Sequence, residues 1–164
     1  MKLEQFNQLT DAAARAAIAH CVALAGWSGE LAAARPYASL DALLQYADKL
    51  ASHWDADDLQ QALAAHPRIG ERASGAGKEA ALSRQEQSAV NDDDSRLKQA
   101  LRNGNADYEQ RFGRVFLIRA RGRSGEEMLA ELQRRLANDP QQEQQEALMQ
   151  LREITLLRLR ESFQ

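Results

Sequence analysis

Three prolines punctuate a chain that is otherwise rich in helix-forming residues, and each stands where a helix would begin or end. Pro36, Pro67 and Pro140 lack the backbone N–H that a helix interior needs, so no helix runs through them undistorted. Between them, leucine and alanine recur at three- and four-residue steps, as they do across residues 40–50. Valine and isoleucine are scarce and aromatic residues make up only 5%, so an extended sheet would lack its usual material. The pattern predicts an all-α fold.

We expect residues 1–164 to form one domain, a helical bundle of about eight helices with one short extended buried segment near 114–120. The segment is the apolar run 115–118, which breaks the helical period after Gly113. Capping residues predict helix starts at these positions: Thr10, Ser39, Asp55, Ser83, Ser124 and Asp139. The first of these helices should run over 10–24 and end at Gly26, and a short one should span 30–35. The triplet 103–105, Asn-Gly-Asn, is expected to kink or break a helix that starts near 91.

Charge, cysteine usage and hydropathy argue against several classes of protein. The 21 basic and 24 acidic residues are interspersed and the net charge is −3, which does not favour nucleic-acid binding. Five arginines between 111 and 123 are interpreted as solvated charges flanking a buried segment. Cys21 is the only cysteine, so no internal disulfide is expected. No apolar run is long enough to span a membrane and no signal-peptide core is present, so we expect a cytoplasmic protein.

Two residues, His66 and Arg158, are candidates for a catalytic or ligand-binding role because of where they lie in the sequence. His66 precedes Pro67 at a predicted helix end, where a group that titrates near neutral pH is held on a rigid corner. The corner fits a catalytic or ligand-binding histidine and also fits an ordinary hydrogen-bonded turn. Arg158 lies among leucines in the last helix and should have an anionic partner, which is either an internal carboxylate or a ligand.

Other site types have no support in the sequence. His20 and His53 are interpreted as structural or surface residues, and no spacing typical of a metal site occurs. Gly70, Gly75 and Gly77 do not form a phosphate-binding loop, and the loop 70–78 is the best candidate for mobility. Ser83 and Glu86 read as a capping box, although a helix start can also bind an anion.

Taken together, several motifs resemble one known family. They are His66-Pro67-Arg68-Ile69-Gly70, Ser83-x-x-Glu86-Gln87, Tyr108-x-x-Arg111-Phe112-Gly113 with Phe116-x-Ile118, Ser124-Gly125-Glu126-Glu127-Met128-Leu129 with Arg135-Leu136-x-Asn138, and Glu143-x-x-x-x-Ala147 running into Ile154-x-x-x-Arg158-Leu159. In this order and spacing the sequence resembles 2-oxo-4-hydroxy-4-carboxy-5-ureidoimidazoline (OHCU) decarboxylases, which act in urate breakdown. The chain has Arg-Ile-Gly after Pro67, where many members have Asp-Leu-Ala, and both forms occur in the family. It has Arg114-Val115 before Phe116, where the family usually has Phe-Pro.

The resemblance implies an all-helical, cofactor-independent homodimer that converts a ureidoimidazoline substrate to (S)-allantoin. It implies that His66 is the catalytic acid/base and that Glu86 and Arg158 act beside it. The implied substrate-binding residues are Pro67, Ser83, Gln87, Ile118, Arg119 and Ala120. No metal, nucleic acid or membrane is expected to take part. Three alternatives stay open: a non-catalytic helical interaction domain, a helical nucleic-acid binder that uses the arginines between 111 and 123, and a family member that acts on a related ureido acid.

Overall fold

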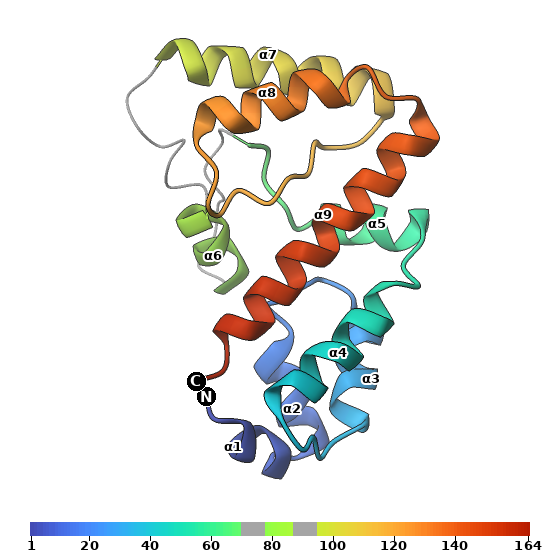
Figure 1. Cartoon of the computed structure of the whole chain (residues 1–164), viewed down its shortest axis with the longest axis vertical. Helices are drawn as coiled ribbons and strands as arrows, with labels where there is room; N and C mark the ends of the chain where they lie inside the picture. The colour runs from blue at the N-terminus through green and yellow to red at the C-terminus, as the bar shows by residue number, and fades with distance from the viewer. Residues whose placement is uncertain (70–77, 87–94) are drawn as a thin grey trace. The chain divides into compact units, whose positions relative to one another are not determined.

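A computed structural model describes residues 1–69, 78–86 and 95–164, and every regular element in these ranges is a helix (Figure 1). The described helices are α1 (Leu3–Gln8), α2 (Asp11–Ile18), α3 (Ala25–Ala33), α4 (Leu40–Ala51), α5 (Ala56–Leu63), α6 (Lys78–Glu86), α7 (Ser95–Phe112), α8 (Gly125–Arg135) and α9 (Pro140–Glu161). The all-α prediction is confirmed. None of these helices is long and apolar enough to cross a membrane.

The chain groups into two compact units. One unit contains residues Met1–Ala62 and Arg152–Gln164, and the other contains Leu63–Leu151. Helix α9 contributes its first half to the second unit and its last turns to the first. The prediction that residues 1–164 form one domain stays a prediction.

In the first unit, each of the helices α1 to α4 packs against the next one along the chain. Side-chain caps mark where α2 and α4 begin. The Thr10 and Ser39 side chains accept hydrogen bonds from the backbone N–H groups three residues on, both at 3.1 Å, as predicted. The predicted helix over 10–24 is wrong, because α2 ends at Ile18 and Gly26 lies inside α3. The consecutive residues 20–22 are all buried, which one face of a partly exposed helix cannot achieve.

The second unit is built on the pair α7 and α8, which lie side by side (Figure 1). Their core consists of Ile69, Leu101, Tyr108, Phe116, Ile118, Ala120, Met128 and Leu132. The predicted break near 103–105 is wrong, because α7 continues through these residues. A Cβ added at Gly104 would lie 2.5 Å from Leu132 Cδ2, so the glycine permits close approach of α8 and does not interrupt α7.

The connection between α7 and α8 is non-helical, and Phe116, Leu117 and Ile118 are buried in it, as predicted for the segment near 114–120. At its end, Ser124 and Glu127 form the predicted capping box, with Ser124 Oγ accepting from Glu127 N at 3.1 Å. Asp139 caps α9 by accepting from Gln142 N at 2.9 Å.

The capping box predicted at Ser83 is wrong. Helix α6 begins at Lys78, so Ser83 lies within it and Glu86 is its last residue. Ala81 and Leu82 are strong helix formers, and they extend the helix in front of the serine. The predicted loop over 70–78 and the predicted helix start near 91 fall almost wholly on 70–77 and 87–94, outside the described residues.

Candidate active site

The His66–Pro67 corner follows the end of α5. The His66 N–H donates to Leu63 O at 3.0 Å, which turns the chain out of the helix, and Pro67 prevents its continuation. Both side chains are half-buried, so the imidazole is neither in bulk solvent nor in the core. Two residues later, Ile69 is 5% exposed and belongs to the core of the second unit. The corner is therefore anchored on both sides of the histidine.

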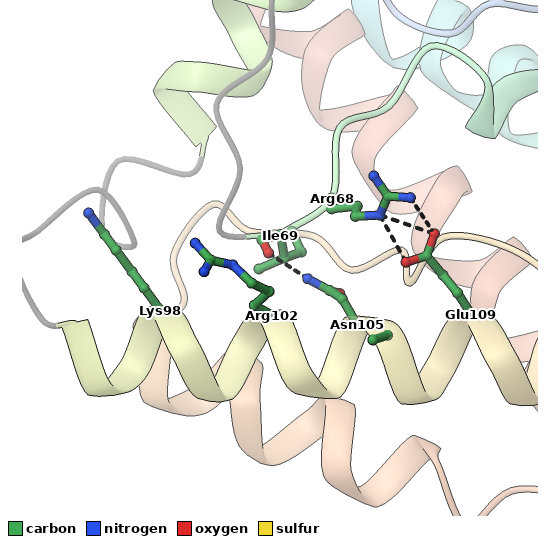
Figure 2. A pocket seen from close by; sticks show the side chains of 7 residues that line it. Arg68, Ile69, Lys98, Arg102, Asn105 and Glu109 are labelled. Carbon is green, nitrogen blue, oxygen red and sulfur yellow. Dashed lines mark hydrogen bonds and ion pairs between the residues drawn. The ribbon is translucent and has the colours of Figure 1, made fainter.

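One face of α7 contacts the residues that follow His66. Arg68 Nε and Nη2 donate to the two carboxylate oxygens of Glu109 at 2.8 and 2.9 Å, and Asn105 Nδ2 donates to Ile69 O at 2.7 Å (Figure 2). A hollow of about 290 Å³ opens here, and its lining is Arg68, Ile69, Lys98, Arg102, Asn105, Ala106 and Glu109. The polar lining residues of α7 follow steps of four, three and four, which a helix places on one face.

Ile118, Arg119 and Ala120 lie in the segment between α7 and α8, where Ile118 and Ala120 are buried. Arg119 N donates to Gln150 Oε1 at 2.8 Å, and Arg119 O accepts from Arg123 Nε at 2.9 Å. Both backbone groups of Arg119 are thus used inside the protein. This arrangement fixes the course of the segment that was predicted to line the substrate site.

A buried polar network also binds the segment between α7 and α8. Glu143, 0% exposed, accepts from Arg135 Nε at 3.0 Å and Nη2 at 2.5 Å, and also from Tyr108 and Asn138. Arg135 Nη1 donates to Leu117 O at 2.8 Å. Burial, then the hydrogen bond to Glu143, raises the pKa of Tyr108 well above its usual range, so the phenol stays protonated and donates.

No role for this network followed from the sequence, although Tyr108, Arg135, Asn138 and Glu143 all belong to the motifs that carry the family resemblance. Tyr108 and Glu143 are 35 positions apart, so no local spacing rule connects them. The resemblance was the only signal that marked these positions.

Arg158 lies in the first unit and is 2% exposed in α9. Its Nη1 is 3.5 Å from the carbonyl oxygens of His20 and Cys21, which are long contacts to partial negative charges. The predicted anionic partner of Arg158 stays a prediction. His20 is buried with Nε2 2.7 Å from Ser162 Oγ, and His53 is exposed, so both fit the structural or surface roles expected of them.

The remaining candidates lie in α6 or beyond its end. Ser83 is 3% exposed, Glu86 is half-buried, and Gln87 lies outside the described residues. The second unit thus contains His66, Pro67, Ser83, Glu86 and the segment 118–120, whereas Arg158 belongs to the first.

The arginines between 111 and 123 make contacts within the protein. Arg111 Nη2 donates to Asn138 O at 2.7 Å, and the guanidinium of Arg111 lies 5.0 Å from the centre of the Phe112 ring. Arg119 donates to Arg121 O. These contacts agree with the interpretation that the arginines flank a buried segment. The interpretation that their charges are solvated is wrong for Arg114, whose Nε and Nη2 are buried. In the ranges the structure describes, no group of three His, Cys, Asp or Glu side chains is arranged to hold a metal ion.

Comparisons with known proteins show what this chain is similar to. A 2-oxo-4-hydroxy-4-carboxy-5-ureidoimidazoline decarboxylase of Haloferax volcanii is 28% identical over 165 residues, covering 99% of this chain and 96% of that protein. A decarboxylase of the same name from Amia calva is 45% identical over 60 residues, which is 37% of this chain. The uric acid degradation bifunctional protein TTL of Arabidopsis thaliana is 31% identical over 146 residues, 87% of this chain. The matches span only 34% of the Amia protein and 45% of the Arabidopsis protein.

Two solved structures share the fold. A crystal structure of OHCU decarboxylase in the presence of (S)-allantoin superposes with a TM-score of 0.74 at 28% identity, covering 88% of this chain and 95% of that one. A crystal structure of (S)-allantoin synthase gives a TM-score of 0.71 at 16% identity over 99% of this chain and 54% of that one, a likeness of fold. The sequence model of OHCU decarboxylases matches residues 7–160, nearly the whole chain, and the protein therefore belongs to the OHCU decarboxylase family.

Proposed function

We propose that the protein decarboxylates 2-oxo-4-hydroxy-4-carboxy-5-ureidoimidazoline to (S)-allantoin in urate degradation, without a cofactor. The observation that carries the proposal is the family match over residues 7–160, which includes the His66–Gly70 corner and the helix that bears Arg158. Relatives named for this activity support it, and one solved relative was crystallised in the presence of (S)-allantoin.

The proposed chemistry follows from the bonds in the substrate. Its ring carbon C4 carries a hydroxyl and a carboxylate and adjoins C5, the carbon that bears the ureido group. When the bond between C4 and the carboxylate breaks, the electron pair passes into the adjacent conjugated C–N system and CO₂ leaves. The C4 hydroxyl then loses its proton to become the ring carbonyl, and C5 gains a proton. The conjugated ring accepts the electron pair, which is why the proposal needs no cofactor as an electron sink.

In this proposal His66 acts as general acid/base on the substrate hydroxyl, because a histidine titrates near working pH. Glu86 orients the imidazole or binds the ureido N–H groups, while Ser83 and Gln87 bind carbonyl groups. Arg158 offers a planar fork for the carboxylate or a ring carbonyl. Delivery of the proton to one face of C5 sets the handedness of allantoin.

Replacing His66 with alanine tests the proposal. His66→Ala should fold like the wild type and lose turnover by about 10²–10⁴-fold, the usual contribution of a positioned acid/base. The assay supplies freshly generated urate-oxidation product, follows loss of its ultraviolet absorbance, and uses circular dichroism to detect single-handed allantoin. His53→Ala is the matched control, because His53 also lies at a helix end but is exposed and has no proposed role.

The outcomes separate the alternatives. Near-wild-type turnover by His66→Ala would remove the proposed role of that residue. A wild-type protein that accelerates neither decay nor single-handed product formation would contradict the proposed reaction. The assay should then be repeated with related ureido acids, which are the expected substrates if the protein is a family member with a different specificity. The homodimer implied by the resemblance and the cytoplasmic location expected from the sequence both stay predictions.

A further inference from the structure

We propose that one face of α7 positions the His66 imidazole for catalysis, through the side chains of Asn105 and Glu109. Neither side chain is assigned a contact with substrate. Asn105 bonds to the backbone of Ile69, and Glu109 pairs with the side chain of Arg68. The inference rests on the proposed function, in which His66 is the acid/base.

A displacement of residues 68 and 69 should displace His66 as well, because the corner between them is short and stiff. Pro67 fixes its own φ angle and restricts the conformation of His66, so few backbone torsions separate the imidazole from the residues that α7 contacts. On the other side, the hydrogen bond from His66 N to Leu63 O ties the histidine to the end of α5. The contacts made by residues 68 and 69 then limit the freedom of the corner relative to α7.

Asn105 fastens the corner at Ile69. Asn105 is 2% exposed and its amide donates to Ile69 O at 2.7 Å, while the Ile69 side chain packs into the same core as Leu101 and Tyr108 of α7. A buried hydrogen bond and an apolar anchor on one residue fix its backbone against a single helix (Figure 2).

Glu109 fastens the corner at Arg68. The guanidinium and carboxylate meet side on, with Nε to Oε2 at 2.8 Å and Nη2 to Oε1 at 2.9 Å, which sets orientation as well as distance. The two side chains are 46% and 26% exposed, so the pair contributes little to folding stability. Its effect on the position of His66 can therefore be measured in a protein that remains folded.

A small displacement of His66 should lower the rate more than it lowers binding. Misplacing a catalytic group by about 1 Å costs up to ~10²-fold in rate, because proton transfer needs a narrow range of distances. We expect Glu109→Arg, which repels Arg68, to lower kcat by about tenfold with KM nearly unchanged, since the lost interaction acts in the transition state. The charge swap Arg68→Glu/Glu109→Arg should restore most of kcat.

The control is a second exposed pair in the same unit. Arg134 and Glu131 are 50% and 35% exposed, so they form another largely exposed pair, and their contact lies outside the corner. Glu131→Arg should therefore leave kcat at the wild-type value. The inference is overturned if Glu109→Arg keeps wild-type kcat, if the swap fails to restore a lost kcat, or if Glu131→Arg lowers kcat equally.

The imidazole resonances of His66 in nuclear magnetic resonance spectra give a readout that does not need turnover. We expect them to shift or broaden in Glu109→Arg and to return in the charge swap. Identical His66 resonances in the wild type and Glu109→Arg would overturn the inference. If the wild type does not turn over the proposed substrate, the proposed function fails while these spectra still decide whether α7 positions the corner.

Discussion

Two neighbouring arginines on α8 make ion pairs that differ mainly in burial, and replacing each with methionine should separate their energies. Arg135 and its partner Glu143 are 2% and 0% exposed. Arg134 and its partner Glu146 are 50% and 24% exposed. Methionine matches arginine closely in helix propensity, so a difference in helix propensity does not affect the comparison. Arg135 also stacks on the Phe116 ring and Arg134 also pairs with Glu131, and each substitution removes that contact too.

In Arg135→Met, the buried Glu143 carboxylate keeps its hydrogen bonds from Tyr108 and Asn138 but loses its cation, and Leu117 O loses its donor. Removing one member of a buried pair costs about 3–5 kcal/mol, because a charge is left in a poorly solvated place. Arg134→Met should cost at most about 1 kcal/mol, because water screens and replaces the exposed pair. A domain is stable by about 5–15 kcal/mol, so the Arg135 variant should still show a measurable unfolding transition.

Urea unfolding followed by far-ultraviolet circular dichroism measures both variants. Equal losses in free energy of unfolding for Arg134→Met and Arg135→Met would refute the reasoning, because burial would then have no energetic consequence here. The double variant Arg135→Met/Glu143→Leu should recover part of the loss, since apolar replacement of a whole buried pair is often tolerated. It should not recover all of it, because the Tyr108 hydroxyl and the Asn138 amide lose a shared acceptor.

Two further predictions concern helix packing and pH. Gly104→Ala should destabilise the protein by up to about 2 kcal/mol, because overpacking against the buried Leu132 outweighs the gain in helix propensity. Gly26→Ala, with no atom within 4 Å of the added Cβ, should stabilise it by about 0.5–1 kcal/mol, and thermal unfolding measures both. Hydrogen bonding to Arg134 lowers the pKa of Glu146 below its usual 4.5. The pair therefore stabilises the fold above that pH, and its contribution is lost as pH falls through the lowered pKa.

Each of these two predictions has its own outcome that would contradict it. Equal stabilisation by both alanine variants would show that Leu132 gives way to the new methyl group. For the pH effect, thermal unfolding of the wild type and Arg134→Met should differ near pH 7 and converge as the carboxyls protonate. A difference that stays constant or grows on acidification would show that the charge interaction is not its cause.

Features that depend on residues within one helical turn were predictable from the sequence. Thr10, Ser39 and Ser124 cap helices as expected, because each bonds to a backbone N–H three residues on. The same rule failed at Ser83, where preceding helix formers carried the helix through the potential cap. The end of the helix that Thr10 caps was also predicted wrongly, because α2 ends at Ile18 and the consecutive residues 20–22 are all buried.

In the candidate site, too, some features were predictable from the sequence and others were not. The His66–Pro67 corner is a local feature, and Pro67 alone predicts that a helix ends there. What holds the corner was not predictable, since Asn105 lies 36 positions from Ile69 and Glu109 lies 41 from Arg68. Neither spacing carries a rule that could pair them.

By itself, the sequence therefore determined the helical class, the capped helix starts and the position of the rigid corner, because proline geometry and capping act within a few residues. Only the tertiary structure decided that Gly104 is a packing contact, that Glu143 and Arg135 are paired in the core, and that α7 fastens the chain after His66. Those features need helices far apart in sequence to meet, and their energies come from burial and from geometry that exists only in the packed chain.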